Sequence, residues 1–187
     1  MRKIVIFASG SGSNAEKIIL HFKNSDSVVV SAVFSNKPDA KVLEKAENLG
    51  VSTVLFDRNS LSDGTVLTKI NAIQPDLIVL AGFLWKFPES IIEHYPGKII
   101  NIHPALLPKY GGKGMYGMNV HRAILENGEE KTGITIHYVN EHYDEGGIVF
   151  QAEVSVVDCT TPEAVAAKVQ ELEHEHFPKV IENLLRK

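Results

Sequence analysis

The chain has 187 residues, of which 44% are hydrophobic and 22% charged, and its net charge is −4 at pH 7. This size and composition fit one globular domain with a full core. The acidic balance argues against nucleic acid as the main partner, because nucleic-acid-binding domains usually carry a basic face.

A single cysteine, Cys159, leaves no possibility of a disulfide framework within the chain. No apolar run approaches the length of a membrane span. The run at residues 4–8 is also too short for the core of a signal peptide, and glycines follow it. We therefore expect a cytoplasmic protein with no membrane partner.

Five short apolar runs, rich in β-branched residues, occur in the first 103 residues. They cover residues 3–8, 27–35, 52–56, 76–82 and 98–103. Nearly unbroken runs of this kind are typical of parallel strands buried on both faces. Helical patterns lie between them, at residues 14–22, 40–49, 67–73 and 88–94. The alternation predicts an α/β fold with a doubly wound, mostly parallel, Rossmann-like sheet.

The pattern changes after residue 130. Residues 132–140 alternate between apolar and polar side chains, and residues 148–157 follow after a short loop. These two segments predict an antiparallel pair of strands. Residues 162–185 predict one long amphipathic helix at the C-terminal end, with a bend near Pro178. We expect a single domain over residues 1–187.

A glycine-rich loop, Ser9–Asn14, joins the first predicted strand to the first helix. The N-terminus of such a helix offers free N–H groups and a positive dipole end to an anion. A dinucleotide site would also need an acidic residue at the end of the second strand, and residues 34–36 contain none. The loop therefore predicts a site for a phosphate monoester, with a tight turn that binds nothing as the alternative.

Asn101 and His103 stand at the end of the fifth predicted strand, and Pro104 prevents the strand from continuing. Being two residues apart, their side chains point to the same face, at the same edge of the sheet as the glycine loop. The Asn amide can donate a hydrogen bond to a developing oxyanion. The His can do the same when protonated, or it can carry a proton.

Asp144 lies in the loop between the two predicted antiparallel strands. A carboxylate beside His103 would raise the pKa of the imidazole and hold the ring in place. Taken singly, a strand-end histidine and an acidic turn are more often structural. Their combination with the glycine loop indicates an active site, which His121 and His137 could support by hydrogen bonds. No cluster of histidines has the spacing of a metal site, so we expect no metal.

These motifs resemble the glycinamide ribonucleotide formyltransferases, a folate-dependent family. The resemblance is carried by SGSGSN (9–14), FSNKPDA (34–40), DLIVLAGF (76–83), INIHPALLPKY (100–110), TGITIHYV (132–139), DEGG (144–147) and VQELEHEHFP (169–178). NIHPALLP is shared by a wider superfamily that includes methionyl-tRNA formyltransferase and formyltetrahydrofolate deformylase. The SGSGSN loop, and the lack of room for the additional domains of those relatives, favour the first family.

The resemblance implies an enzyme of de novo purine biosynthesis. It would transfer the formyl group of its co-substrate, 10-formyltetrahydrofolate, to the amine of glycinamide ribonucleotide, giving formylglycinamide ribonucleotide and tetrahydrofolate. Asn101 and protonated His103 would stabilise the oxyanion, and Asp144 would pair with His103 and assist proton movement. Residues 1–100 would form the phosphate-binding half and residues 101–187 the folate-binding and catalytic half.

The resemblance also implies binding residues. The ribonucleotide would contact Gly12, Ser13, Asn14, Gln170, Glu171, Leu172 and Glu173. The folate would contact Leu84, Trp85, Lys86, Phe87, Asn101, Asn140, Glu141, His142, Tyr143 and Asp144. We expect these two small molecules as partners, and a monomer or weak homodimer. Without the resemblance, Glu173 would be assigned as a solvated helix carboxylate, and residues 84–87 fit ordinary core equally well.

The chain departs from the family pattern in three places. Trp85 stands where many members have arginine, and the segment Gly111–Met118 is longer than usual and could act as a lid. No arginine between Leu55 and Thr68 clearly matches the one that reaches the folate tail, although Arg58 is nearby. Three other functions stay open: a hydrolase that releases formate, a transferase acting on another amine such as an amino-sugar nucleotide, and a non-catalytic binding protein.

Overall fold

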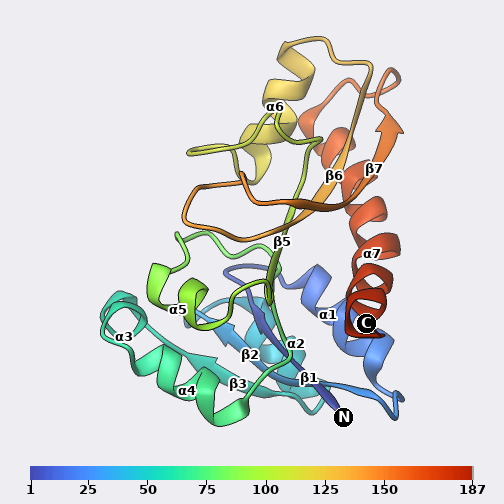
Figure 1. Ribbon diagram of the computed structural model, residues 1–187. Coiled ribbons are helices and arrows are strands. Elements are labelled where there is room, and N and C mark those ends of the chain that lie inside the picture. The colour runs from blue at the N-terminus through green and yellow to red at the C-terminus, as the bar shows by residue number, and fades with distance from the viewer. Residues whose placement is uncertain (187) are drawn as a thin grey trace.

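The computed structural model describes residues 1–186 and contains one seven-stranded sheet (Figure 1). Its strands are β1 (Arg2–Phe7), β2 (Val28–Ser35), β3 (Ser52–Leu55), β4 (Leu77–Leu80), β5 (Ile99–His103), β6 (Lys131–Tyr138) and β7 (Ile148–Ser155). The spatial order is β3-β2-β1-β4-β5-β6-β7. The first five strands are parallel, and β6 and β7 each pair antiparallel with the preceding strand. The predicted mixed sheet is confirmed.

Helices cover both faces of the sheet (Figure 1). They are α1 (Ser13–Phe22), α2 (Lys41–Asn48), α3 (Arg58–Ser62), α4 (Thr65–Ile73), α5 (Glu89–His94), α6 (Met118–Glu126) and α7 (Pro162–Arg186). One core cluster contains residues of α1, α2, α6 and α7, and the other contains residues of α3, α4 and α5. The sequence patterns do not predict α3 and α6, because α3 is a single turn held by an Asp57 capping box and α6 follows a glycine-rich segment.

Strand β1 explains why its apolar run is unbroken. Ile4 and Ile6 face the cluster that contains α1 and α7, whereas Val5 and Phe7 face the cluster that contains α4 and α5. Successive side chains of a strand point to opposite faces, so a strand covered on both sides needs apolar residues at every position.

The long helix α7 runs beside α1 and reaches across the sheet (Figure 1). It continues through Pro178 as one helix, and its buried side chains include Val165, Val169, Phe177 and Ile181. No helix within residues 1–186 is long and apolar enough to cross a bilayer. Because α7 contacts α1, it can bring side chains of the C-terminal segment to the glycine loop that precedes α1.

The carboxyl ends of β1, β4 and β5 lie level with one another, since Phe7 pairs with Leu80 and Leu80 pairs with Asn101. The connections on the two sides of β1 run in opposite directions, to β2 on one side and to β4 on the other. Such a reversal opens a crevice at the carboxyl ends of the strands, which is where doubly wound folds bind ligands. The glycine loop, the segment after β4 and the end of β5 all meet there.

Candidate active site

A cleft of about 570 Å³ opens at this edge of the sheet. Its walls come from the end of β5, the segment after β4, the loop 112–117, helix α6 and the loop 139–144, with Asn14 and Glu173 beside them. This volume and the mixture of apolar and polar walls suit a small molecule. Two other hollows lie around Asp76 and Lys98, at the opposite edge, and contain none of the predicted site residues.

The three predicted catalytic side chains come together in this cleft. Asn101 and His103 both line it, and Asp144 enters from the loop after β6. His103 Nδ1 lies 3.6 Å from Asp144 Oδ2, and the two side chains are only 5% and 13% exposed. This separation gives a strong electrostatic interaction without a direct hydrogen bond.

The other ring nitrogen of His103, Nε2, is held by a hydrogen bond to a backbone carbonyl. Its Nε2–H donates to the Tyr110 carbonyl at 2.7 Å. A carbonyl only accepts, so the proton of the neutral ring resides on Nε2 and the protonation equilibrium concerns Nδ1. Burial lowers the pKa of His103 by more than Asp144 and the Tyr110 carbonyl raise it. Asp144 thus raises the pKa as expected, but the net shift is downward, because the ring is nearly enclosed and the lost solvation outweighs the neighbouring carboxylate.

Asp144 is held between two histidines. Its Oδ2 accepts the Gly112 N–H at 2.9 Å, and its Oδ1 lies 3.6 Å from His137 Nε2. Burial favours the neutral acid, but His137, His103 and the Gly112 N–H together keep the pKa of Asp144 below its ordinary value. The carboxylate is therefore charged at neutral pH and can stabilise a positive charge on either ring.

His137 and His121 complete the polar wall. His137 Nδ1–H donates to the Tyr138 carbonyl at 2.8 Å, which leaves Nε2 to accept a hydrogen bond from the Asn101 amide at 3.1 Å. His121 projects from α6 and is buried, and its Nδ1 has no hydrogen-bond partner within residues 1–186. Burial lowers the pKa of His121, and the nearby His103 adds to this. In the sequence, the alternation of residues 132–140 is the signal for His137.

The glycine loop leaves the start of α1 open. Gly12 precedes the helix with φ +70°, and no side chain caps the first turn, so its N–H groups are available to an anion. Two side chains of α7 reach this turn. Glu173 Oε2 accepts the Asn14 amide N–H at 2.8 Å, and the Gln170 amide N–H donates to Ser13 Oγ at 3.2 Å.

Two residues predicted to bind the ribonucleotide, Glu171 and Leu172, do not line the cleft. Glu171 is exposed and Leu172 packs against the main core, so of the segment 170–173 only Glu173 lines the cleft. Burial raises the pKa of Glu173, and the hydrogen bond from Asn14 opposes this rise. The assignment of Glu171 and Leu172 to ribonucleotide binding stays a prediction.

The predicted folate residues form two walls of the cleft. They are Leu84, Trp85, Lys86 and Phe87 on one side and Asn140, Glu141, His142, Tyr143 and Asp144 on the other. Leu84 is 43% exposed and Tyr143 is 45% exposed, so apolar surface lines the opening. Phe87 is instead buried and packs edge-on against Phe7, with 5.0 Å between ring centroids. Its side chain belongs mainly to the core.

Comparison with known proteins identifies the family of this chain. The Formyl transferase family model matches residues 2–181. The chain belongs to the formyl transferase family. It is 40% identical to the phosphoribosylglycinamide formyltransferase of Escherichia coli, over 95% of this chain and 84% of that protein. It is 39% identical to the chloroplastic phosphoribosylglycinamide formyltransferase of Arabidopsis thaliana, over 96% of this chain and 64% of that protein.

Solved structures agree with the resemblance found in the sequence. The crystal structure of phosphoribosylglycinamide formyltransferase from Anaplasma phagocytophilum has a TM-score of 0.90 and 34% identity, covering 99% of this chain and 87% of that one. The corresponding structure from Brucella melitensis has a TM-score of 0.89 and 35% identity, covering 100% and 96%. The predicted family and fold are thereby confirmed.

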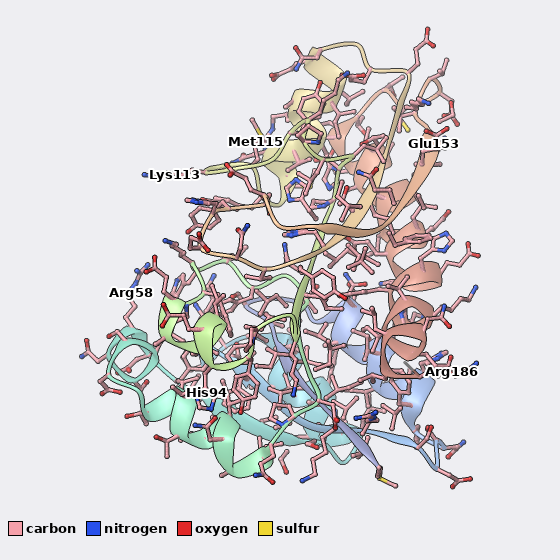
Figure 2. The ribbon with its side chains drawn as sticks, viewed as in Figure 1. Arg58, His94, Lys113, Met115, Glu153 and Arg186 are labelled. Atoms are coloured by element: carbon pink, nitrogen blue, oxygen red, sulfur yellow. The ribbon has the colours of Figure 1, made fainter. Side chains whose placement is uncertain are left out.

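Trp85 and the loop 112–117 both line the cleft. The Arg58 guanidinium stacks on the Trp85 ring, 4.5 Å from its centroid. Residues 112–117 of the predicted long loop line the cleft, and Figure 2 shows Lys113 at the tip of this loop, pointing away from the body of the protein. The loop therefore forms part of the wall, and its action as a lid stays a prediction. Within residues 1–186 no group of three or more His, Cys, Asp or Glu side chains is arranged to hold a metal ion.

Proposed function

We propose that this chain transfers the formyl group of 10-formyltetrahydrofolate to the amine of glycinamide ribonucleotide, as a step of de novo purine biosynthesis. The observation that carries the proposal is the convergence of Asn101, His103 and Asp144 in one cleft with the open first turn of α1. The three side chains can stabilise an oxyanion and move a proton, and the first turn of α1 can hold a phosphate.

The walls of the cleft suit the two substrates. The phosphate would lie on the free N–H groups of Ser13 and Asn14, and Glu173 would accept hydrogen bonds from ribose hydroxyls. The buried Oδ1 of Asn14 has no partner within residues 1–186, so it would also accept a hydrogen bond from a ribose hydroxyl. The folate ring would lie between Leu84 and Tyr143, where apolar surface is exposed.

The residues suggest how the reaction proceeds. The substrate amine would attack the electrophilic formyl carbon of bound 10-formyltetrahydrofolate, giving a tetrahedral oxyanion with a new C–N bond. Collapse of this oxyanion then breaks the bond to the folate nitrogen. Asn101 has a second amide N–H to offer the developing oxyanion. Neutral His103 accepts the amine proton at Nδ1 and, as the imidazolium, both stabilises the oxyanion and returns the proton to the leaving folate nitrogen. Asp144 stabilises the imidazolium from 3.6 Å.

The three other functions fit less well. A hydrolase that releases formate needs no phosphate site, whereas the first turn of α1 is open to an anion. A different amine acceptor would have to place a phosphate on the same turn. A purely binding role does not require a proton-accepting ring beside a charged carboxylate. We also propose a monomer or weak homodimer, acting in the cytoplasm, with the two small molecules as its partners.

An absorbance assay of folate product tests the proposal. Wild type and His103→Ala would be compared with and without glycinamide ribonucleotide, with His94→Ala as the control because His94 is exposed on α5 (Figure 2). Turnover that needs the ribonucleotide, and that only His103→Ala loses, is the expected result. Turnover without the ribonucleotide would establish the hydrolase instead. If wild type releases no folate product either with or without the ribonucleotide, the proposal is overturned and other amines become the candidates.

A further inference from the structure

Tyr110 has a backbone conformation that tyrosine rarely adopts. Its φ is +57°, in the left-handed region. A non-glycine residue in that region costs free energy, and it is maintained when the surrounding structure holds it there. Its carbonyl is the group that accepts the Nε2–H of His103. The direction of this carbonyl therefore depends on whatever holds Tyr110.

The Tyr110 side chain is anchored to Glu129, in the turn between α6 and β6. Its hydroxyl donates to Glu129 Oε1 at 2.9 Å, and Lys109 Nζ donates to the same oxygen at 2.9 Å. The Glu129 backbone N–H is in turn bonded to the Ile124 carbonyl at the end of α6, at 3.2 Å. The hydrogen bonds from Lys109 and Tyr110 lower the pKa of Glu129, so the acceptor is a carboxylate and the bond from the hydroxyl is a strong one.

The Tyr110 carbonyl has a competitor for the His103 proton. Asp144 lies on the Nδ1 side of the ring, and a carboxylate is a better acceptor than a carbonyl. His137 and His121 are the other titratable groups near the ring, and both disfavour added positive charge when they are themselves charged. If the carbonyl moved away, a neutral ring would place its proton on Nδ1 and donate it to Asp144. Nδ1 would then no longer be free to accept a proton in the cleft.

We propose that Tyr110 and Glu129 are positioning residues, which hold the Tyr110 carbonyl on His103 and thereby select the ring tautomer with Nδ1 free for the reaction. The inference rests on the proposed function for its catalytic consequence. Neither side chain lines the cleft, so both act through His103 and not on the substrates. The contacts thus connect Glu129, in the turn after α6, through Tyr110 to the ring of His103.

Four variants test the inference. Tyr110→Phe removes the hydroxyl, and Glu129→Ala removes its acceptor. Glu129→Gln keeps an acceptor oxygen for the Tyr110 hydroxyl, although a weaker one than the carboxylate, and should therefore keep the wild-type tautomer of His103. Lys109→Met is the matched control, because it removes the other hydrogen bond to Glu129 Oε1 and leaves the bond from Tyr110 in place.

Two measurements are made on each variant. The nitrogen-15 NMR shifts of labelled histidine report the tautomer of His103, whose signals are assigned by their loss in His103→Ala. Steady-state kinetics report kcat and KM. In Tyr110→Phe and Glu129→Ala we expect the Nδ1–H tautomer to appear and kcat to fall roughly ten-fold, with KM within about two-fold, since the ring is misplaced while the binding walls are intact. Glu129→Gln and Lys109→Met should match wild type.

Unchanged tautomer or unchanged kcat in both Tyr110→Phe and Glu129→Ala would overturn the inference. Circular dichroism identifies a variant that does not fold, and the other of the two then decides. The NMR measurement of the tautomer does not depend on turnover, so the positioning role and the proposed function can be refuted independently of each other. A wild type that transfers no formyl group refutes the proposed function, while a tautomer change in the variants still supports the positioning role.

Discussion

Asp144 Oδ2 lies 3.6 Å from His103 Nδ1. The other ring nitrogen, Nε2, is hydrogen-bonded to the Tyr110 carbonyl on the opposite side of the ring. The carboxylate therefore faces the one nitrogen of His103 that can gain or lose a proton. Because burial keeps the pKa of the ring below its ordinary value, the ring is neutral in the empty cleft and is ready to accept a proton. Asp144 sets how readily it does so.

Asp144→Asn should lower kcat by about a hundred-fold or more, which is the usual effect of losing a partner in acid–base catalysis. Activity requires neutral His103, so it rises with pH through the pKa of the ring. Asp144 is one of the groups that raise this pKa, so its loss lowers the pKa further and moves the rising limb of the profile to lower pH. The measurement is kcat/KM between pH 5 and 8.

Glu145→Gln is the control for this experiment. Glu145 is the next residue in the loop, is exposed and does not line the cleft, so its profile should match wild type. An Asp144→Asn enzyme with wild-type activity at every pH would show that the carboxylate and the ring are not coupled in the reaction.

The sequence was sufficient to predict the sheet and the positions of Asn101 and His103. Side chains two residues apart on a strand share a face, and Pro104 marks where the strand ends, so local pattern carries the information. The contact between Asn14 and Glu173 is different, because it joins residues 159 positions apart. Only the resemblance placed Glu173 at the site, since an isolated carboxylate on a helix has no distinguishing pattern.

The direction of the His103 pKa shift could not be predicted from local pattern. It depends on how completely three separate elements enclose the ring: α6, β6 and the loop 139–144. The contact of the Tyr110 carbonyl with His103 is also hard to predict, for a related reason. The glycine-rich residues that follow it show no periodicity, so nothing in the sequence indicates that its backbone turns back toward His103.

Gly12→Ala should both destabilise the fold and weaken ribonucleotide binding. Gly12 has φ +70°, and a Cβ there would collide with Val42, so the loop and α2 must move apart. We expect a loss of about 1–3 kcal/mol in the free energy of unfolding and a rise in KM for the ribonucleotide. Gly10→Ala is the control in the same loop, because a Cβ at that position meets nothing within 4 Å. Urea unfolding and steady-state kinetics measure the two effects, and equal behaviour of the two variants would refute the assigned role of the loop.

Glu173→Gln should raise KM for the ribonucleotide roughly ten-fold, equivalent to about 1.4 kcal/mol, and leave KM for the folate unchanged. Glutamine is a weaker acceptor for ribose hydroxyls than a carboxylate, although it has nearly the same shape. Since burial raises the pKa of Glu173, a neutral amide is not expected to destabilise the fold. Glu175→Gln, exposed on the same helix, is the control. If both variants retain the wild-type KM, Glu173 serves only to hold Asn14.

The folded protein should lose stability as the pH falls below about 6.5, because three of its histidines are buried or half-buried. Burial lowers the pKa of His103, His121 and His174 from an ordinary value of 6.5. Above that pH each ring is neutral in both states. Below it, the unfolded chain binds a proton that the folded chain does not, so the free energy of unfolding falls by at most about 1.4 kcal/mol per pH unit for each ring.

His121→Leu isolates one of these contributions. The variant removes a titrating ring whose Nδ1 has no partner within residues 1–186, and leucine fills much of the same space in the core. Its free energy of unfolding in urea should lie within about 1 kcal/mol of wild type at pH 8, where the ring is neutral in both states. Between pH 7 and 5 the variant should lose less stability than wild type does. His94→Gln, on the surface of α5, should follow the wild-type curve. Parallel curves for His121→Leu and wild type would mean that burial of this ring is not what makes the fold sensitive to acid.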